Sequence, residues 1–222
     1  MPNSNINYLA VIGDLVGSRQ LNSQERSTVQ KRFQEILDRI NHEFKEDIAA
    51  LFLITAGDET QGILHRTQRC YQILRKIQMD LSPIKIVFGL GYGPLTTELK
   101  EYAIGADGPA FYYARQALNE AKKERKAYGK SILREVRIHS NDEIRDQTID
   151  ALFLSLAVIR DHLTEQQEKI VELLEKGKSP KEISEILKIP LPNVSRTIET
   201  THYREYELIV ACIETWFAKA FN

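Results

Sequence analysis

Apolar residues are distributed along the first two-thirds of the chain in blocks of two different periods. Residues 7–13, NYLAVIG, form a short and almost continuous apolar run, which predicts a buried strand. Residues 23–45 instead repeat apolar positions every three or four residues, which predicts a helix with one apolar face. Residues 49–66 hold two apolar runs separated by Ala-Gly-Asp-Glu, and this pattern predicts a β-hairpin with the acidic pair at its turn.

The alternation of helix and strand patterns continues beyond the hairpin. A helical pattern covers 67–81, and the strand predicted at 84–93 contains three glycines that permit close approach of another backbone. A glycine-rich turn after Tyr102 leads into a helix that continues to residue 129, and a last strand is expected at about 131–138. This order predicts an α+β fold in which helices cover a sheet.

Beyond the last expected strand the chain becomes polar and then uniformly helical. The segment 141–150, NDEIRDQTID, is charged, and strand signals cease after it. We therefore expect an α/β domain over 1–145 and a helical domain over 146–222. The final helix, YREYELIVACIETWFAKAF, is more apolar than a solitary surface helix requires, so it either packs on the helix expected at 151–163 or forms a homodimer interface.

Composition and charge narrow the class of protein. The hydrophobic fraction of 42% and the charged fraction of 27% are those of ordinary folded domains. No run approaches the roughly 20 apolar residues of a membrane-spanning helix, and the first residues lack signal-peptide features, so a cytoplasmic protein without membrane contact is expected. The net charge of -1 provides no general attraction to nucleic acid. The two cysteines, Cys70 and Cys212, are expected to be buried reduced thiols.

Carboxylates at the ends of the predicted strands are candidate metal ligands. Asp14 ends the first strand, while Asp58 and Glu59 lie at the turn of the hairpin. Adjacent strands can bring these positions together, and the backbone carbonyl of Leu15 can add a further oxygen. Such oxygen ligands suit Mg²⁺ bound at a phosphate. Alternatively, Asp14 caps the following turn and the acidic pair faces solvent, because Gly-Asp is a common turn dipeptide.

Two further segments are candidates for binding a nucleotide-like phosphate. Gly17, Ser18 and Arg19 follow the first Gly-Asp, where a turn offers backbone N–H groups and a hydroxyl. Such a turn is also ordinary loop chemistry. Asp107 precedes the helix that contains Arg115, and it either contacts the ligand or caps that helix.

Four motifs between residues 13 and 115 occur in the order GDLVGSR, ITAGDETQGIL, IKIVFGLGYGPL and IGADGPAFYYAR, and together they resemble the SatD family of bacterial proteins. More distantly they are similar to class III nucleotidyl cyclases and GGDEF diguanylate cyclases, which have a ferredoxin-like palm. The resemblance implies such a palm here, with Asp14, Asp58 and Glu59 as ligands of Mg²⁺ or Mn²⁺. It also implies that Arg115 stabilises charge on a transferring phosphate, with a surface helical arginine as the alternative.

Two positions depart from the adenylyl cyclase pattern. Ile54 stands four residues before Asp58, where those enzymes have a purine-selecting lysine. Phe111 stands four residues before Arg115, where they have asparagine. Both departures count against cyclase activity.

The segment 164–201 resembles the helix-turn-helix of LuxR-type regulators and of sigma-factor region four. Thr164 can cap a first helix that ends at Gly177, and Ser179 with Pro180 can start a second helix. A third helix over 191–201 would be the recognition helix of a DNA-binding module. The side chains expected to contact DNA are Asn193, Ser195, Arg196 and Thr197.

The charge of the helical segment does not favour DNA. From residue 164 to residue 222 eight Lys and Arg stand against ten Glu, although neutralisation of phosphates supplies most of the affinity of DNA-binding proteins. The alternative is that this scaffold serves dimerisation or the docking of a partner.

Three functions fit these patterns. In the first, a regulatory protein acting in transcription senses a metal-bound nucleotide with its palm and transmits the bound state through the helix-turn-helix. In the second, the palm is an active Mg²⁺-dependent nucleotidyl or phosphoryl transferase. In the third, a degenerate palm is a scaffold that binds only other proteins.

Overall fold

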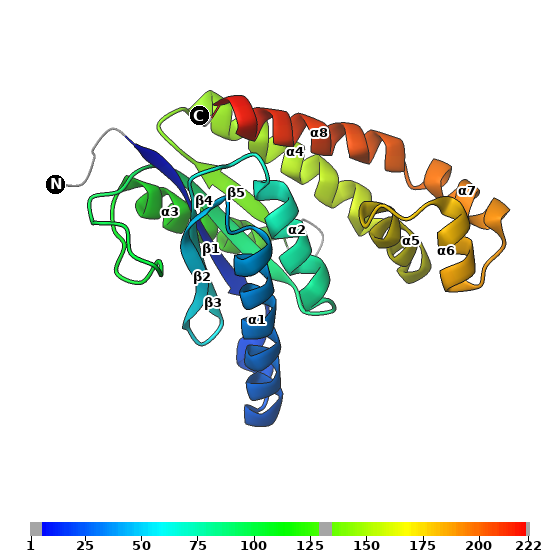
Figure 1. Ribbon diagram of the computed structural model, residues 1–222, viewed down its shortest axis with the longest axis horizontal. Helices are drawn as coiled ribbons and strands as arrows, with labels where there is room; N and C mark the ends of the chain where they lie inside the picture. Colours follow the sequence, from blue (N-terminus) through cyan, green and yellow to red (C-terminus); the bar gives the residue numbers. More distant parts are fainter. Residues whose placement is uncertain (1–5, 129–134, 221–222) are drawn as a thin grey trace.

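A five-stranded sheet carries the N-terminal part of the chain in the computed structural model, which describes residues 6–128 and 135–220 (Figure 1). Its strands are β1 (Asn7–Leu15), β2 (Ile48–Ala56), β3 (Glu59–Leu64), β4 (Ile86–Pro94) and β5 (Val136–His139). They lie in the order β2-β3-β1-β4-β5. Strand β1 is antiparallel to both of its neighbours, β3 and β4, whereas β4 and β5 are parallel. The central position of β1 places its end between two other strands.

Helices cover the sheet and form the C-terminal part of the chain (Figure 1). The helices are α1 (Ser23–Glu43), α2 (Cys70–Leu81), α3 (Pro109–Tyr128), α4 (Glu143–Asp161), α5 (Glu165–Glu175), α6 (Pro180–Leu187), α7 (Leu191–Thr200) and α8 (Tyr203–Ala220), with a 3₁₀ turn, η1 (Ser18–Gln20), after β1. The fold is mixed α+β, as the alternating patterns predict.

None of the helices within the described residues has the combined length and apolar character needed to cross a membrane.

The predicted hairpin is confirmed, with β2 and β3 paired antiparallel at one edge of the sheet. The last strand spans Val136–His139, and residues 131–134 of the expected range lie outside the part of the chain that the structure describes. The helix predicted at 23–45 is α1, which begins at the capping residue Asn22. The apolar periodicity therefore predicted these helices and strands to within a few residues. The pairing of strands that are not neighbours in the chain, such as β1 with β3, is seen only in the structure.

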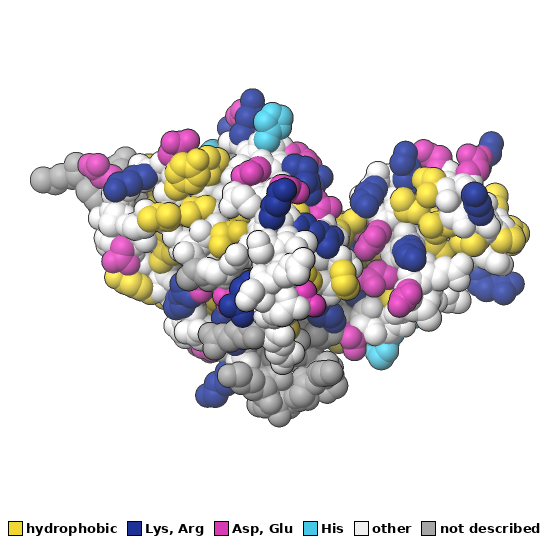
Figure 2. All heavy atoms as spheres, turned by 90° about the horizontal axis from the view of Figure 1, so that it is seen from below, with side chains coloured by type: hydrophobic (Ala, Val, Ile, Leu, Met, Phe, Trp, Pro, Cys, Tyr) yellow, Lys and Arg dark blue, Asp and Glu magenta, His cyan; other side chains and the backbone are white. Residues whose placement is uncertain are grey.

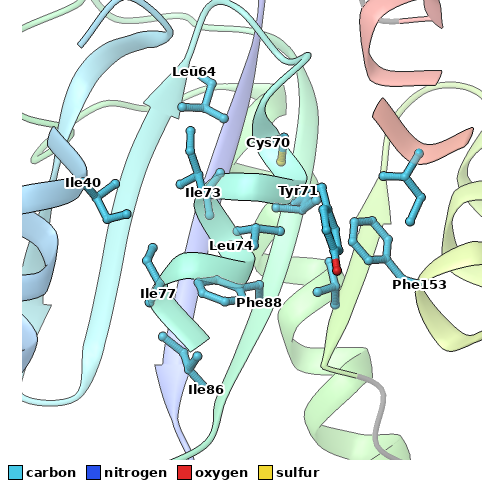
Figure 3. Packing of buried hydrophobic residues seen from close by; sticks show 14 of the residues in the cluster. Ile40, Leu64, Cys70, Tyr71, Ile73, Leu74, Ile77, Ile86, Phe88 and Phe153 are labelled. Atoms are coloured by element: carbon cyan, nitrogen blue, oxygen red, sulfur yellow. The ribbon is translucent and has the colours of Figure 1, made fainter. Parts of the chain in front are cut away.

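The two faces of β1 determine where the helices pack. Because successive side chains of a strand point to opposite faces, Leu9 and Val11 belong to one face and Ala10 and Ile12 to the other. The first pair lies in a core with α1 and α2, and the second pair packs with α3. Figure 3 shows the first core around α2, with Ile73, Leu74, Ile77, Ile86 and Phe88 among its labelled residues. The same alternation assigns Asp14 to the α3 face.

Glycines of β4 allow α3 to lie very close to the sheet. A Cβ atom on Gly89 would lie 2.2 Å from the backbone oxygen of Ala114, and one on Gly91 would lie 2.0 Å from that of Ala110. No side chain fits at these distances, so the predicted close approach of another backbone is confirmed at both positions. As a result, side chains of α3 reach the sheet directly.

Helix α8 packs on α2, and helix α4 packs on β5 and against the ring of Tyr71 in α2. The ring of Phe153 in α4 lies with its centroid 6.3 Å from that of Tyr71 and 6.4 Å from that of Phe217. Thr67 Oγ1 donates a hydrogen bond of 2.6 Å to the carbonyl oxygen of Phe217. Of the two alternatives for the last helix, packing on the preceding long helix is observed in the structure. Since α4 begins at Glu143, the expected division after residue 145 falls within its first turn.

The expected burial of both cysteines is wrong for one of them. Cys70 is fully buried, whereas Cys212 is exposed on α8. Ile213 and Phe217 face the core, and a residue one position before Ile213 is rotated by about 100° around the helix. The outward position of Cys212 follows from that rotation.

Helices α5 and α6 begin where their capping signals predict, and α7 begins at Leu191, the start expected for the third helix. The Thr164 hydroxyl accepts a hydrogen bond from the N–H of Gln167, and the Ser179 hydroxyl accepts one from the N–H of Glu182. Pro180 lies at the first position of α6. The three helices share a small core made of Ile170, Ile183 and Val194.

Candidate functional site

Three carboxylates meet at the end of β1. Asp14 is paired with Glu59 across the β1–β3 ladder, so both side chains lie on the α3 face of the sheet. Asp58 follows β2 in the hairpin turn, and its carbonyl oxygen accepts a hydrogen bond of 3.0 Å from the N–H of Leu15. The strand-end and hairpin positions singled out by the sequence are therefore neighbours in the structure.

Helix α3 supplies a cation to two of these carboxylates. The Lys122 ammonium lies 2.7 Å from Asp14 Oδ1. The Arg115 guanidinium forms two hydrogen bonds with Glu59, of which the one from Nη2 to Oε1 is 2.7 Å long. Seven residues separate the two cations, which is close to two helical turns, so both lie on the same face of α3. Sequence reasoning missed Lys122, although this spacing from Arg115 was visible.

Burial and neighbouring charges both shift the pKa of Asp14. Burial raises the pKa of the Asp14 carboxyl above its usual value, the hydrogen bond and charge of Lys122 lower it, and the charges of Asp58 and Glu59 raise it further. The hydrogen bond to Glu59 raises the pKa of Arg115. The three carboxylates at the end of β1 formally carry more charge than Lys122 and Arg115 neutralise together, so the site favours a further cation.

The segment after Asp14 turns back onto Asp58. Gly17 has a positive φ of 78°, and Ser18, which begins η1, is buried. The Ser18 hydroxyl donates a hydrogen bond to Asp58 Oδ2. In this structure the hydroxyl predicted to face a phosphate is therefore held by a carboxylate. The side chain of Arg19 lies outside the described part of the chain.

Asp107 lies at the opposite end of the sheet from Asp14. Its carbonyl oxygen accepts a 2.8 Å hydrogen bond from Thr96, just beyond β4, and the end of β4 pairs with the start of β1. Its carboxylate accepts hydrogen bonds from the N–H of Gly108 and the hydroxyl of Tyr112. The structure does not bring Asp107 together with the other candidate phosphate-binding residues.

The two positions that depart from the adenylyl cyclase pattern hold packing residues. Phe111 is buried in the core between α3 and the sheet, and Ile54 is half-buried beside the other core. Neither apolar side chain offers a hydrogen bond to a purine or a ribose. A nucleotide at this site would need other groups to recognise its base and sugar.

The donor atoms suit a hard cation, although their present partners are protein groups. Carboxylate oxygens and a strand-end carbonyl are the ligands that Mg²⁺ and Mn²⁺ take up. In the structure Asp14 forms an ion pair with Lys122, and Glu59 forms one with Arg115. Asp58 accepts a hydrogen bond from the Ser18 hydroxyl. Among the described residues, no three His, Cys, Asp or Glu side chains are arranged as a group that could hold a metal ion. Metal binding here would require these carboxylates to exchange partners.

A comparison with models of protein families identifies the family of this chain. The model described as the SatD family matches residues 8–195, from β1 into α7. The chain belongs to the SatD family. The SatD match therefore includes the end of β1, the hairpin and α3, and it continues through most of the C-terminal helices.

Solved structures similar to this SatD-family chain contain cyclase or GGDEF domains, and a search of the curated proteins finds no match. The guanylyl cyclase Cya2 is 14% identical over 64% of this chain and 85% of its own, with a TM-score of 0.40. The guanylate cyclase domain of RhGC from Catenaria anguillulae, in complex with GTP, is 13% identical over 51% of this chain and 72% of its own, with a TM-score of 0.42. An EAL/GGDEF domain protein from M. capsulatus is 14% identical over 58% and 83%, with a TM-score of 0.39. These likenesses carry no argument about activity.

Proposed function

We propose that this SatD-family protein is a regulatory protein that binds a nucleotide-like phosphate ligand together with Mg²⁺ or Mn²⁺ at the end of β1. The observation that carries the proposal is the juxtaposition of three carboxylates on strand ends with two cations on one face of α3. A metal-bound phosphate needs both kinds of group, because oxygen anions hold the metal and cations or N–H donors hold the phosphate oxygens.

Each residue has a defined role in this proposal. Asp14, Asp58 and Glu59 hold the metal, with the carbonyl of Leu15 as a further oxygen. The phosphate is held by Arg115, whose planar guanidinium suits its oxygens. The turn that contains Gly17, Ser18 and Arg19 supplies further donors. When bound, the metal neutralises phosphate charge, and the chain's own groups orient the ligand.

The proposal treats residues 146–222 as the part that transmits the bound state. Helices α5, α6 and α7 are interpreted as a helix-turn-helix, with α7 as the recognition helix. Three side chains of α7 that are exposed and available for contact with DNA are Asn193, Ser195 and Arg196, whereas Thr197 is half-buried. On the face drawn in Figure 2, basic and acidic side chains are mixed over the part at the right that contains α5, α6 and α7, and they form no basic patch there. Few phosphates would therefore be neutralised on binding, so contact with DNA would be weak at physiological salt.

The metal and phosphate proposal is tested by replacing Asp58 with asparagine. The change keeps the size of the side chain and an oxygen that can accept the hydrogen bond from Ser18. It removes the negative charge that binds a cation. We expect Asp58→Asn to lower the affinity for GTP or ATP measured with Mn²⁺ by about tenfold or more, since a charge-assisted ligand is lost. Calorimetric titration gives the affinity, and circular dichroism reports whether the fold is retained.

Asp38→Asn is the matched control for this experiment. Asp38 is exposed on α1, which covers the opposite face of the sheet, so this variant should bind like the wild type. Equal loss in both variants would contradict a site at the end of β1. If the wild type also converts the nucleotide, and Asp58→Asn does not, the protein is a transferase. If no nucleotide binds with metal, the scaffold function is favoured.

The proposed contact with DNA has its own test. We expect short fragments of bacterial genomic DNA to bind at low salt, with an affinity that falls as salt rises. Arg196→Ala should weaken this binding by about tenfold, because α7 carries one basic side chain on its exposed face. Fluorescence anisotropy at several salt concentrations measures both effects. The absence of binding at the lowest salt concentration would remove the transcriptional part of the proposal and leave the metal site untouched.

A further inference from the structure

Lys122 occupies the position at Asp14 that the proposed function assigns to a divalent metal. Its ammonium lies 2.7 Å from Asp14 Oδ1, and two more carboxylates, Asp58 and Glu59, act electrostatically on Asp14 from nearby. The Asp14 side chain is 20% exposed and that of Lys122 is 36% exposed. The lysine is therefore a cation held against an acidic cluster, with its side chain partly exposed to solvent.

An ammonium and a divalent cation cannot share this carboxylate without strong repulsion. Mg²⁺ binds oxygen at about 2.1 Å and requires a nearly octahedral set of ligands, whereas an ammonium approaches to hydrogen-bond distance. Two like charges so close together in a half-buried site repel each other by several times the thermal energy. Metal binding at Asp14 must therefore displace Lys122.

Of the two α3 cations, Lys122 is the one that leaves its carboxylate more easily. Arg115 is held to Glu59 by two hydrogen bonds of its planar guanidinium. Lys122 has a flexible four-carbon stem and a compact charge. Once displaced, it remains on the face of α3 that also carries Arg115, where the cations that would hold a phosphate are gathered.

We propose that Lys122 is the resident counter-ion of the metal site: it neutralises Asp14 when no metal is bound, competes with the metal for that carboxylate, and turns to the phosphate when the metal binds. This inference rests on the proposed function. Lys122 is thereby a phosphate-binding residue of the loaded site and a competitor of the metal in the empty one. Because of these two roles, removing the Lys122 charge should raise the affinity for the metal and lower the affinity for the phosphate.

Substituting Lys122 by methionine separates the two roles. We expect Lys122→Met to bind Mn²⁺ alone about three- to tenfold more tightly than the wild type, because the metal no longer has to displace an ammonium. With saturating Mn²⁺, the same variant should bind inorganic triphosphate about tenfold more weakly, because a charged phosphate contact is lost. Electron paramagnetic resonance of free Mn²⁺ measures the first affinity, and calorimetry with triphosphate measures the second.

Two control variants make the result specific. Lys123→Met removes the same charge from an exposed neighbouring position of α3 without removing the ion pair to Asp14, so both affinities should stay at the wild-type value. Lys122→Arg keeps a cation at Asp14, so its Mn²⁺ affinity should stay near that of the wild type. Opposite shifts confined to Lys122→Met support the inference.

Other outcomes overturn it, and they can be told apart. If Lys122→Met and the wild type bind Mn²⁺ with the same affinity, or if the variant binds it more weakly, Lys122 does not compete with the metal, while the proposed function stands. If neither protein binds Mn²⁺ at millimolar concentration, the proposed metal site itself is wrong, and the inference is overturned with it.

Discussion

Replacing Glu175 by alanine should destabilise the protein by about 3–5 kcal/mol, because it leaves the guanidinium of Arg75 buried without its counter-ion. Glu175 ends α5, and Arg75 lies in α2, with the ion pair 2.7 Å long and the side chains only 13% and 6% exposed. The Tyr206 hydroxyl also donates to Glu175, and it is hydrogen-bonded to the hydroxyl of Tyr71. Burial raises the pKa of Tyr71 to about 12, so this hydroxyl keeps its proton at neutral pH. Urea unfolding measures the loss.

Two further variants show whether burial is the cause. The neighbouring pair Lys76–Glu43 also involves α2, but its side chains are 37% and 48% exposed, so Glu43→Ala should cost about 0–1 kcal/mol. The double variant Arg75→Met with Glu175→Met removes both buried charges and should recover most of the loss. A Glu175→Ala cost as small as that of Glu43→Ala would show that Arg75 reaches solvent easily.

Replacing Gly91 by alanine should destabilise the protein by about 1–3 kcal/mol or more, because the added methyl group has no space. Its Cβ would lie 2.0 Å from the backbone oxygen of Ala110 and 2.2 Å from the backbone nitrogen of Ala114. These atoms belong to the backbone of α3 and cannot rotate away as a side chain would. Helix α3 must therefore move from the sheet, which also displaces Lys122 and Arg115. Unfolding in urea gives the change in stability.

Gly93→Ala is the matched control on the same strand. Its Cβ would lie 3.3 Å from the backbone nitrogen of Ala110, which is tight but tolerable with a small shift. We expect it to cost less than Gly91→Ala. Equal stability of Gly91→Ala and the wild type would mean that α3 is not held against β4 as closely as described.

The buried core connects the candidate site with the C-terminal helices. One continuous cluster includes Val11 and Leu15 of β1, Leu74 of α2, Phe153 of α4 and Phe217 of α8. A ligand at the end of β1 can favour one arrangement of the C-terminal helices only if it binds the two arrangements with different affinity. The ion pair between Arg75 and Glu175 is a contact through which such a difference would reach α5.

Much of the fold and the location of the candidate site could be predicted from the sequence. The apolar run before Asp14 and the acidic turn of the hairpin place their carboxylates at strand ends, and antiparallel pairing then brings Asp14 opposite Glu59. The caps at Thr164 and Ser179 act within a few residues, so local signals sufficed for them. The strand ends and the caps depend on local sequence alone, whereas the pairing of β1 with β3 does not.

The features that were missed depend on how distant segments pack. The partner of Asp14 is Lys122, which lies more than a hundred residues away on a helix whose direction over the sheet has no local signal. The sequence leaves Asp107 either as a ligand contact or as a helix cap, and the antiparallel pairing of β4 with β1 places it at the other end of the sheet from Asp14. Apolar periodicity does not show strand direction, so it could not separate these two ends.

Thermal unfolding with Mg²⁺ or Mn²⁺ and each of ATP, GTP and cyclic dinucleotides, on the wild type and on Asp14→Asn, tests the central claim most directly. Ligands that bind the folded state raise the unfolding midpoint, by about 5–10 °C at a hundredfold excess over the Kd for a chain of this size. We predict that metal with nucleotide raises the wild-type midpoint by more than metal alone does, that nucleotide without metal does not raise it, and that Asp14→Asn loses the metal-dependent shift. A wild-type midpoint unchanged by every combination, or an equal shift in Asp14→Asn, would contradict a metal-dependent nucleotide site at the end of β1.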